Sequence, residues 1–223
     1  MLNERLSLIA SLIRPGERVA DIGTDHAYLP IFLRQSGKSS HVLACDIGEK
    51  PLAVAAENIK NCGCGGIELR LCDGLDGIAE DETDTVVIAG MGGECIAGII
   101  SRCGWLPGSG KRLLLQPMNS PEELRRALCH GFSLVSEHAV FDSGRVYTVL
   151  HAVADGTHVK EDGEFVFTGL LDPKNSCDRA FLEKQYSRLD ECASPLEKIK
   201  SEREKFIYYR TAANIIKRKL ERE

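Results

Sequence analysis

The first 150 residues alternate between short apolar segments and stretches with the spacing of amphipathic helices. The apolar segments are typical of buried strands and cover 18–22, 41–45, 67–71, 85–89 and 112–116. The helical patterns cover 2–13, 29–35, 51–61, 94–100 and 122–129. Parallel strands need crossovers long enough to hold such helices, and 132–141 with 145–153 predict a closing antiparallel pair. The pattern predicts an α/β fold with a doubly wound, mostly parallel sheet.

Four of these strands end at an acid or a glycine. The residues at the strand ends are Asp21 with Gly23, Asp46, Asp73 and Gly90. In an open α/β sheet, ligands bind beyond the carboxyl ends of the strands, so we expect these residues to meet at one edge. A single Asp also caps helices and forms turns. Their repetition at equivalent places favours a shared binding site.

The loop after the first strand, Asp21-Ile-Gly-Thr-Asp-His-Ala-Tyr-Leu-Pro30, lacks the G-x-G-x-x-G pattern of dinucleotide-binding proteins. Asp25 and Tyr28 stand where the second and third glycines would fall. Two acids beside a helix N-terminus suit hydroxyls, ammonium groups or a cation better than a pyrophosphate. Asp46 lies near the place where an acid binds ribose hydroxyls, and Asp73 is placed to meet an adenine amino group. The combination indicates S-adenosylmethionine (SAM), a nucleoside without phosphate.

Composition predicts a globular protein in a reducing, cytoplasmic environment. Hydrophobic residues make up 43% and charged residues 27% of the 223 positions. We find no apolar run near the ~18 residues of a membrane helix and no signal peptide, and we expect no membrane partner. The nine cysteines are scattered and odd in number, which favours free thiols. Cys62-Gly-Cys64 is the one close pair, and without a second pair at ligand spacing it favours a turn over a metal site.

Charge is distributed unevenly along the chain. Residues 195–223 hold nine Lys/Arg and five Asp/Glu, a net +4, although the whole chain carries −5. A basic tail on an acidic body can bind a polyanion. The alternative is a solvated helical surface with i, i+4 ion pairs.

The C-terminal region predicts two antiparallel helices. One opens at Asp172-Pro173 and carries apolar residues at helical spacing until Ser194-Pro195 interrupts it. Ser194 is predicted to be the N-cap of the second helix, with Pro195 at its first position and Glu197 completing a capping box. Apolar residues at helical spacing continue to position 220.

Three segments together resemble the bacterial TrmK-type tRNA (adenine-N1)-methyltransferases: the loop of residues 21–30, Ala89-Gly-Met-Gly-Gly93, and Gln116-Pro-Met-Asn119. The resemblance implies a Rossmann-like class I SAM methyltransferase domain over residues 1–155. It also implies a small helical, coiled-coil-like domain over 160–223. The implied reaction is methylation of N1 of an adenine in the D-arm region of tRNA. The tail matches in architecture rather than in motif.

We assign candidate roles to the residues in these motifs. Those predicted to bind SAM are Asp21, Gly23, Thr24, His26, Asp46, Ile47, Asp73, Gly74 and Gly90. Those predicted to bind tRNA are Tyr28, Met91, Gly92, Gly93, Gln116, Asn119, Lys205, Arg210 and Lys217. Asp25 is the candidate catalytic residue, since a carboxylate near N6 of the adenine can stabilise the cationic product or accept a proton. Its alternatives are a helix cap and a ligand of the SAM amino group.

Other classes of protein remain open at this point. A methyltransferase acting on another RNA or a small molecule would share the cofactor site. A nicotinamide-dependent oxidoreductase would share the sheet and Asp46, but needs the phosphate-binding glycines that the first loop lacks. A non-enzymatic RNA-binding protein would use the basic tail alone. We expect no metal, and a monomer or weak oligomer.

Overall fold

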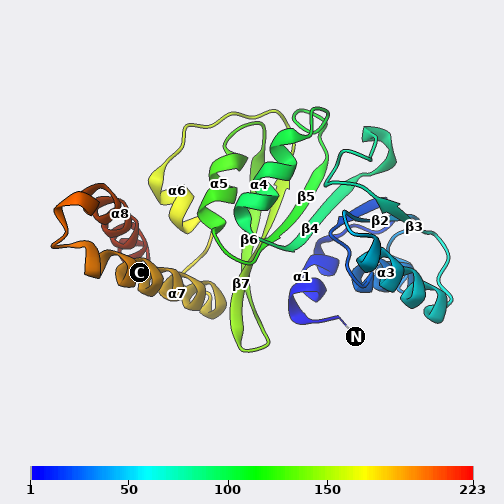
Figure 1. Cartoon of the computed structure of the whole chain (residues 1–223), viewed down its shortest axis with the longest axis horizontal. Helices are drawn as coiled ribbons and strands as arrows, with labels where there is room; N and C mark the ends of the chain where they lie inside the picture. Colours follow the sequence, from blue (N-terminus) through cyan, green and yellow to red (C-terminus); the bar gives the residue numbers. More distant parts are fainter. Residues whose placement is uncertain (1, 223) are drawn as a thin grey trace.

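The computed structural model describes residues 2–222 and contains one seven-stranded sheet covered by helices on both faces (Figure 1). The strand order is β3-β2-β1-β4-β5-β7-β6. The strands are β1 (Val19–Ile22), β2 (Val42–Asp46), β3 (Ile67–Leu71), β4 (Thr85–Met91), β5 (Arg112–Pro117), β6 (Ser133–Asp142) and β7 (Arg145–Val153). Strands β1 to β5 pair in parallel, and β7 pairs antiparallel with both β5 and β6. The predicted fold class and the closing antiparallel pair are therefore confirmed.

The helices of the sheet region agree with the predicted patterns to within about two residues. They are α1 (Glu4–Leu12), α2 (Tyr28–Gln35), α3 (Glu49–Cys62), α4 (Gly93–Arg102) and α5 (Pro121–Leu128). Adjacent strand residues belong to opposite cores, as Val86 packs with α4 and α5 whereas Val87 packs with α1 and α2. This alternation follows from the two-residue period of a strand. A sheet buried on both faces explains why its strands are apolar at every position.

Strand order reverses between β1 and β4, which lie side by side in the centre of the sheet. From β1 the chain moves outward to β2 and β3, then returns to β4 and continues to the other edge. The loops that leave β1 and β4 consequently diverge to opposite faces. In doubly wound sheets this divergence opens the crevice in which ligands bind.

The C-terminal region forms α6 (Gly163–Thr168), α7 (Ser176–Ala193) and α8 (Arg203–Leu220). Helices α7 and α8 pack against each other in opposite directions beside the β6–β7 hairpin (Figure 1). Their shared core includes Phe181, Leu182, Leu189, Ala213 and Ile216. The predicted antiparallel helices are present, whereas the short α6 has too few residues to produce a recognisable period.

Both predicted helix starts in this region are wrong. Helix α7 is capped by Asn175, whose side-chain oxygen accepts from the N–H groups of Cys177 and Asp178, rather than opening at Asp172. Ser194 has helical backbone angles, and its hydroxyl donates to the Asp190 carbonyl at 2.8 Å. A hydroxyl bonded backward to the preceding turn cannot cap a following helix. Two single-turn 3-10 helices (Ser194–Leu196 and Lys200–Glu202) therefore separate α7 from α8, which begins at Arg203.

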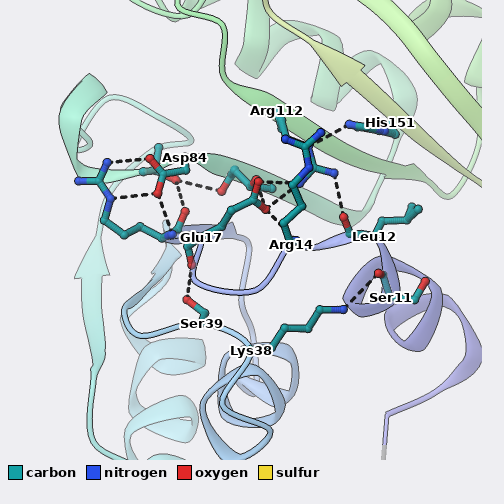
Figure 2. A network of polar contacts seen from close by, with 12 residues as sticks. Ser11, Leu12, Arg14, Glu17, Lys38, Ser39, Asp84, Arg112 and His151 are labelled. Atoms are coloured by element: carbon teal, nitrogen blue, oxygen red, sulfur yellow. Dashed lines mark hydrogen bonds and ion pairs between the residues drawn. The ribbon is translucent and has the colours of Figure 1, made fainter.

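A polar network holds the amino ends of the central strands, at the edge opposite the strand-end loops (Figure 2). Arg112, at the start of β5, donates to both carboxylate oxygens of Glu17 and to the Leu12 carbonyl. Glu17 also accepts from the Thr85 hydroxyl at the start of β4. Arg112 further contacts the His151 imidazole, and burial, followed by the charge of Arg112, lowers the pKa of His151 to about 4. This network therefore stabilises the sheet at the amino ends of its strands, and the strand-end loops lie at the opposite edge.

The turn after α3 contains the close cysteine pair. Cys62 is the last residue of the helix, and Gly63 follows with a φ of +66°, which glycine adopts without strain. Within residues 2–222, no group of three or more His, Cys, Asp or Glu side chains is arranged to hold a metal ion. Among the helices described here, none has both the length and the apolar character needed to cross a membrane.

Candidate active site

A pocket of about 260 Å³ opens at the carboxyl ends of β1 and β4. It brings together seven of the predicted site residues: Asp21, Gly23, Thr24, Asp25, His26, Tyr28 and Gly90. Its remaining lining residues are Asn3, Arg5, Leu6, Leu29 and Ala89. The loop after β1 thus forms one side of the pocket, and the end of β4 forms another.

The loop after β1 is held in a tight turn by backbone contacts to β2. The N–H groups of Gly23 and Thr24 both donate to the Cys45 carbonyl, at 2.8 and 2.9 Å. Gly23 has a φ of +76°, and Asp25 and Ala27 follow with positive φ angles of 50° and 57°. Positive φ is costly for residues that carry a Cβ, and such strain gathers at functional sites. The strained turn directs the Asp25 side chain toward solvent at the pocket.

Asp21 lies beneath this loop as a buried carboxylate. Its Oδ2 accepts from the Thr24 hydroxyl at 2.7 Å. Burial raises the pKa of Asp21 to about 6, the Thr24 hydrogen bond opposes the rise, and the charge of Asp46 adds to it. A buried acid that lines a pocket is stabilised in its charged form when a cationic ligand approaches it.

Asp25, His26 and Tyr28 form the exposed edge of the pocket. The Asp25 carboxylate is 65% exposed and lies 3.3 Å from His26 Nε2. The His26 and Tyr28 rings stack with centroids 5.2 Å apart, and Tyr28 remains 56% exposed. Asn58 on α3 donates to the His26 carbonyl at 3.0 Å and holds this segment in place. A carboxylate and a stacked aromatic face are therefore both available to a ligand.

Asp46 connects the end of β2 to the same loop. Its Oδ2 accepts from the backbone N–H of Asp25 at 3.3 Å, and its Oδ1 accepts from the N–H of Gly48 at 2.9 Å. Ile47, the next residue, is 70% exposed. Asp46 and Ile47 stand outside the pocket lining, beside its β2 margin. Each carboxylate oxygen keeps a further lone pair for a hydroxyl donor.

The residues after β3 do not line the pocket. The Asp73 carboxylate is mostly exposed and accepts from Arg102 on α4 at 3.1 Å. Gly74 has a φ of +62°, and a Cβ there would come within 2.9 Å of Ile99. Gly74 therefore packs against α4 and does not line the pocket.

The end of β4 contains a bulge at Gly90. The pairing of β4 with β5 shifts register between Ala89 and Met91, and the Gly90 N–H donates to Gln116 Oε1 at 3.2 Å. Gly90 has a φ of +83°, and a Cβ built there meets nothing within 4 Å. Because Gly90 also lines the pocket, the bulge leaves room where a side chain would otherwise stand.

The other glycines of this segment have a different reason to lack a side chain. Gly92 and Gly93 are among the residues predicted to bind tRNA. A Cβ on Gly92 would instead lie 2.9 Å from Asn119 Oδ1, and one on Gly93 only 2.1 Å from the Ser120 carbonyl. The two glycines thus allow the start of α4 to pack against the turn after β5.

Met91 and Gln116 are not among the residues that line the pocket. A Cβ on Gly23 would be 2.3 Å from Met91 Cε, so the Met91 side chain packs against the first loop. Gln116 is fully buried and its Nε2 donates to the Pro117 carbonyl at 2.8 Å. Asn119, by contrast, is exposed at the end of β5.

The three predicted basic residues of the tail all lie on α8 and do not line the pocket. Figure 1 shows α8 at the opposite end of the molecule from β2 and β3. Each of the three residues already has an acidic neighbour. Lys205 pairs with Glu202 at 2.8 Å, Lys217 approaches Glu221 at 3.9 Å, and Arg210 pairs with Asp190 on α7.

The contribution of the N-terminal helix to the pocket was not predicted from the sequence. Asn3, Arg5 and Leu6 all line the pocket. Asn3 caps α1 by accepting from the Leu6 N–H at 3.0 Å. An Asn before a helical pattern was a usable indication of the cap, but nothing in the sequence places α1 beside strand ends 20 to 90 residues away.

The fold and this pocket are those of a Rossmann-like methyltransferase domain, and the family model described as a methyltransferase domain matches residues 2–150. The tRNA (adenine(22)-N(1))-methyltransferase of Bacillus subtilis is 36% identical over 173 residues, which cover 76% of this chain and 72% of the relative. The chain belongs to the TrmK-type methyltransferase family.

Solved structures agree with this assignment. A Streptococcus pneumoniae structure in complex with S-adenosyl-L-methionine has 31% identity and a TM-score of 0.84, covering 99% of this chain and 100% of that one. The TrmK structure of M. capricolum with S-adenosyl-homocysteine has 28% identity and a TM-score of 0.82, covering 99% and 98%. These similarities extend over the helical tail as well as the sheet.

Proposed function

We propose that this protein transfers the methyl group of SAM to N1 of an adenine in the D-arm region of tRNA. The observation that carries the proposal is the pocket at β1 and β4, which combines a buried carboxylate, an exposed carboxylate and an open glycine bulge. The Bacillus subtilis relative supports the choice of substrate and of ring nitrogen. Because tRNA is the substrate, the proposed place of action is the cytoplasm.

The residues of the pocket fit the cofactor. SAM carries a cationic amino group and ribose hydroxyls, and it has no phosphate. Asp21 is proposed to stabilise the amino group, and Asp46 is proposed to accept from ribose hydroxyls with its free lone pairs. Gly23, Thr24 and His26 are proposed to shape the loop around the cofactor, while Ile47, Asp73 and Gly74 are proposed to lie toward its adenine end.

When bound, SAM supplies an electrophilic methyl group on a sulfonium. N1 of adenine has an in-plane lone pair, so the protein must align N1 with that methyl group and accept a cationic product. Asp25 is proposed to stabilise this charge or to accept a proton from N6. Its 65% exposure leaves the carboxylate accessible from the pocket mouth. A helix-capping role is disfavoured because Ala27 is the N-cap of α2, without a side-chain hydrogen bond.

The target base must leave its stack in folded RNA to reach the pocket. The exposed Tyr28 ring, already stacked on His26, is proposed to receive one face of that base. Met91 and Asn119 are proposed to complete the base site from the β4 and β5 sides. Gln116, Gly92 and Gly93 are proposed to support it from beneath rather than to touch the base.

Division of the chain into a catalytic domain over 1–155 and a helical domain over 160–223 is part of the proposal. The helical domain is proposed to hold the tRNA body through Lys205, Arg210 and Lys217. Lys205 and Lys217 are more than half exposed in their ion pairs, whereas Arg210 and Asp190 are about one third exposed. Exposed pairs are worth at most ~1 kcal/mol. Phosphates can therefore compete most readily for Lys205 and Lys217.

The decisive experiment is methyl transfer to unmodified tRNA, with the modified nucleotide mapped by primer extension and mass spectrometry. We expect N1-methyladenosine at one D-arm position. Methylation of another nucleotide would overturn the substrate assignment, and no transfer to tRNA would overturn the proposed function. A thermal-shift series with SAM and NAD addresses the oxidoreductase alternative, since protection by NAD alone would contradict a SAM site.

A further inference from the structure

We propose that Arg5 is a positioning residue that acts through Gln116 to hold the Gly90 bulge in the shape that admits the target base. The inference rests on the proposed function for its catalytic consequence, but the coupling itself is a property of the free protein. It assigns a role to the N-terminal helix α1, which the cofactor and substrate assignments leave without one.

Arg5 reaches from α1 across the sheet edge, and its guanidinium is held on three sides. Its Nε donates to Asp142 Oδ2 at 2.6 Å and its Nη1 donates to Gln116 Oε1 at 2.8 Å. The guanidinium also stacks on the Tyr147 ring at 4.8 Å. The side chain is 19% exposed, so its charge is largely removed from water. An Arg fixed in this way presents its donors in one geometry.

Gln116 connects Arg5 to Gly90, because the hydrogen bonds around its side-chain amide allow only one orientation. Oε1 accepts from both Arg5 Nη1 and the Gly90 N–H, while Nε2 donates to the Pro117 carbonyl. Turning the amide over would place its NH₂ group against two donors and its oxygen against an acceptor. The side chain is fully buried, so water cannot relieve that mismatch.

Gly90 depends on this contact for its backbone hydrogen bond. The register shift in β4 removes its N–H from the regular ladder, and Gln116 Oε1 provides the replacement acceptor. Without Arg5, Gln116 loses its charge-assisted partner and the amide gains freedom to rotate. The Gly90 N–H then loses its acceptor, and the bulge can relax into the open space of the pocket. Displacements of about 1 Å at a reacting centre cost about 100-fold in rate.

Deuterium exchange of the free protein tests the coupling without any methyl transfer. In Arg5→Met, we expect the peptide that contains Gly90 to exchange at least fivefold faster, with other strand peptides unchanged. Gln116→Met is expected to give the same change. Arg179→Met, which removes an exposed arginine on α7, is the matched control and is expected to leave Gly90 unchanged. Unchanged Gly90 exchange in Arg5→Met would overturn the proposal.

Single-turnover kinetics test the functional consequence in the full-length protein. We expect Arg5→Met and Gln116→Met each to slow methyl transfer about 10- to 100-fold, and SAM affinity to change less than threefold. The double variant should be no slower than Gln116→Met, because both residues act in one relay. Independent, multiplicative losses would overturn the relay, as would a tenfold loss of SAM affinity in Arg5→Met alone.

Arg5→Lys keeps the proposal testable if Arg5→Met fails to fold. Lysine can reach one acceptor but cannot bridge Asp142 and Gln116, so we expect an intermediate effect on both exchange and rate. Wild-type exchange at Gly90 together with a wild-type rate in Arg5→Lys would contradict the proposal that the guanidinium must bridge Asp142 and Gln116. Failure of the wild-type protein to methylate tRNA would refute the proposed function, whereas the exchange data would still decide whether Arg5 controls Gly90.

Discussion

The backbone N–H of Asp25 donates to the Asp46 carboxylate across 3.3 Å, which joins the loop after β1 to the end of β2. This contact sets the distance between Asp25, which lines the pocket, and Asp46, which lies beside the pocket. Asp46 is also held by the Gly48 N–H, so its position is fixed before any ligand binds. A preorganised acceptor of this kind costs little ordering on binding.

Asp46→Ala is expected to weaken SAM binding about 10- to 100-fold. The change removes a charged acceptor for the ribose hydroxyls, and such hydrogen bonds contribute about 1.5–3 kcal/mol. It also releases the Asp25 N–H. Isothermal titration calorimetry measures the affinity, and Asp76→Asn, an exposed acid of the neighbouring loop, is the control. Equal affinities for wild type and Asp46→Ala would contradict the ribose assignment.

Asp25→Asn is expected to lower the rate of methyl transfer more than the affinity for SAM. The amide keeps the size of the side chain but cannot stabilise a cationic adenine with a full charge or accept its proton. We expect a loss of at least tenfold in single-turnover rate, in the range typical of general acid–base groups. A normal rate with weakened SAM binding would make Asp25 a cofactor ligand instead.

The buried Asp21 makes a prediction about pH. Its carboxyl titrates near 3.8 in the unfolded chain and at about 6 in the folded protein. The folded state therefore holds the proton more tightly, and stability falls as pH rises through this interval. Above pH 6 the cost stays near ~3 kcal/mol, from about 1.4 kcal/mol per pKa unit. Asp21→Asn removes that cost and can still accept from Thr24.

The melting temperature of Asp21→Asn is accordingly expected to exceed that of wild type at pH 8, with the two converging near pH 4. Circular dichroism at a series of pH values gives the comparison. Because His151 titrates in both proteins, its contribution cancels in the difference. A gap that stays constant from pH 4 to pH 8 would show that Asp21 is not the titrating group.

The tail assignment leads to a salt-dependent prediction. Replacing Lys205, Arg210 and Lys217 by Gln is expected to weaken tRNA binding about 5- to 20-fold at moderate salt. The slope of log affinity against log salt should become shallower, by up to about 0.9 for each phosphate that the variant no longer neutralises. SAM affinity serves as the internal control. If the tRNA affinity and its salt slope are both unchanged, the basic residues of α8 form only ion pairs within the protein and do not contact tRNA.

The sheet and the first loop could be predicted because their chemistry is local. Buried parallel strands must be apolar throughout, and an Asp or Gly that ends such a run stands out in the sequence. The same logic located Asp21, Gly23 and Gly90, which the structure brings into one pocket. The antiparallel closure was predictable because only a short turn separates its two strands.

What could not be predicted depends on contacts between distant segments. Arg5 meets Gln116 and Asp142 across more than a hundred residues, and no periodicity encodes such a pairing. Gly92 and Gly93 were predicted to bind tRNA, but their packing partner is the turn after β5. The start of α8 was misplaced because Ser194 makes the backward hydrogen bond rather than the cap, a choice that local sequence leaves open.

Arg125 on α5 and Glu137 on β6 form a buried ion pair that also contacts the helical tail. We expect a large loss of stability when this pair is broken. Both side chains are fully buried, and Glu137 also accepts from the Thr148 hydroxyl and the Leu170 N–H. Glu137→Gln keeps the shape but leaves the Arg125 charge without its counter-ion. Breaking one partner of such a pair costs about 3–5 kcal/mol.

Urea unfolding of Glu137→Gln measures this cost, with Glu183→Gln as the control. Glu183 pairs with Arg179 on the exposed face of α7, where loss of an ion pair changes the free energy of unfolding by at most about 1 kcal/mol. Since Leu170 lies between α6 and α7, we also expect faster deuterium exchange in that connection. A Glu137→Gln protein as stable as Glu183→Gln would mean that the surrounding hydrogen bonds, and not the charge, hold the tail against the sheet.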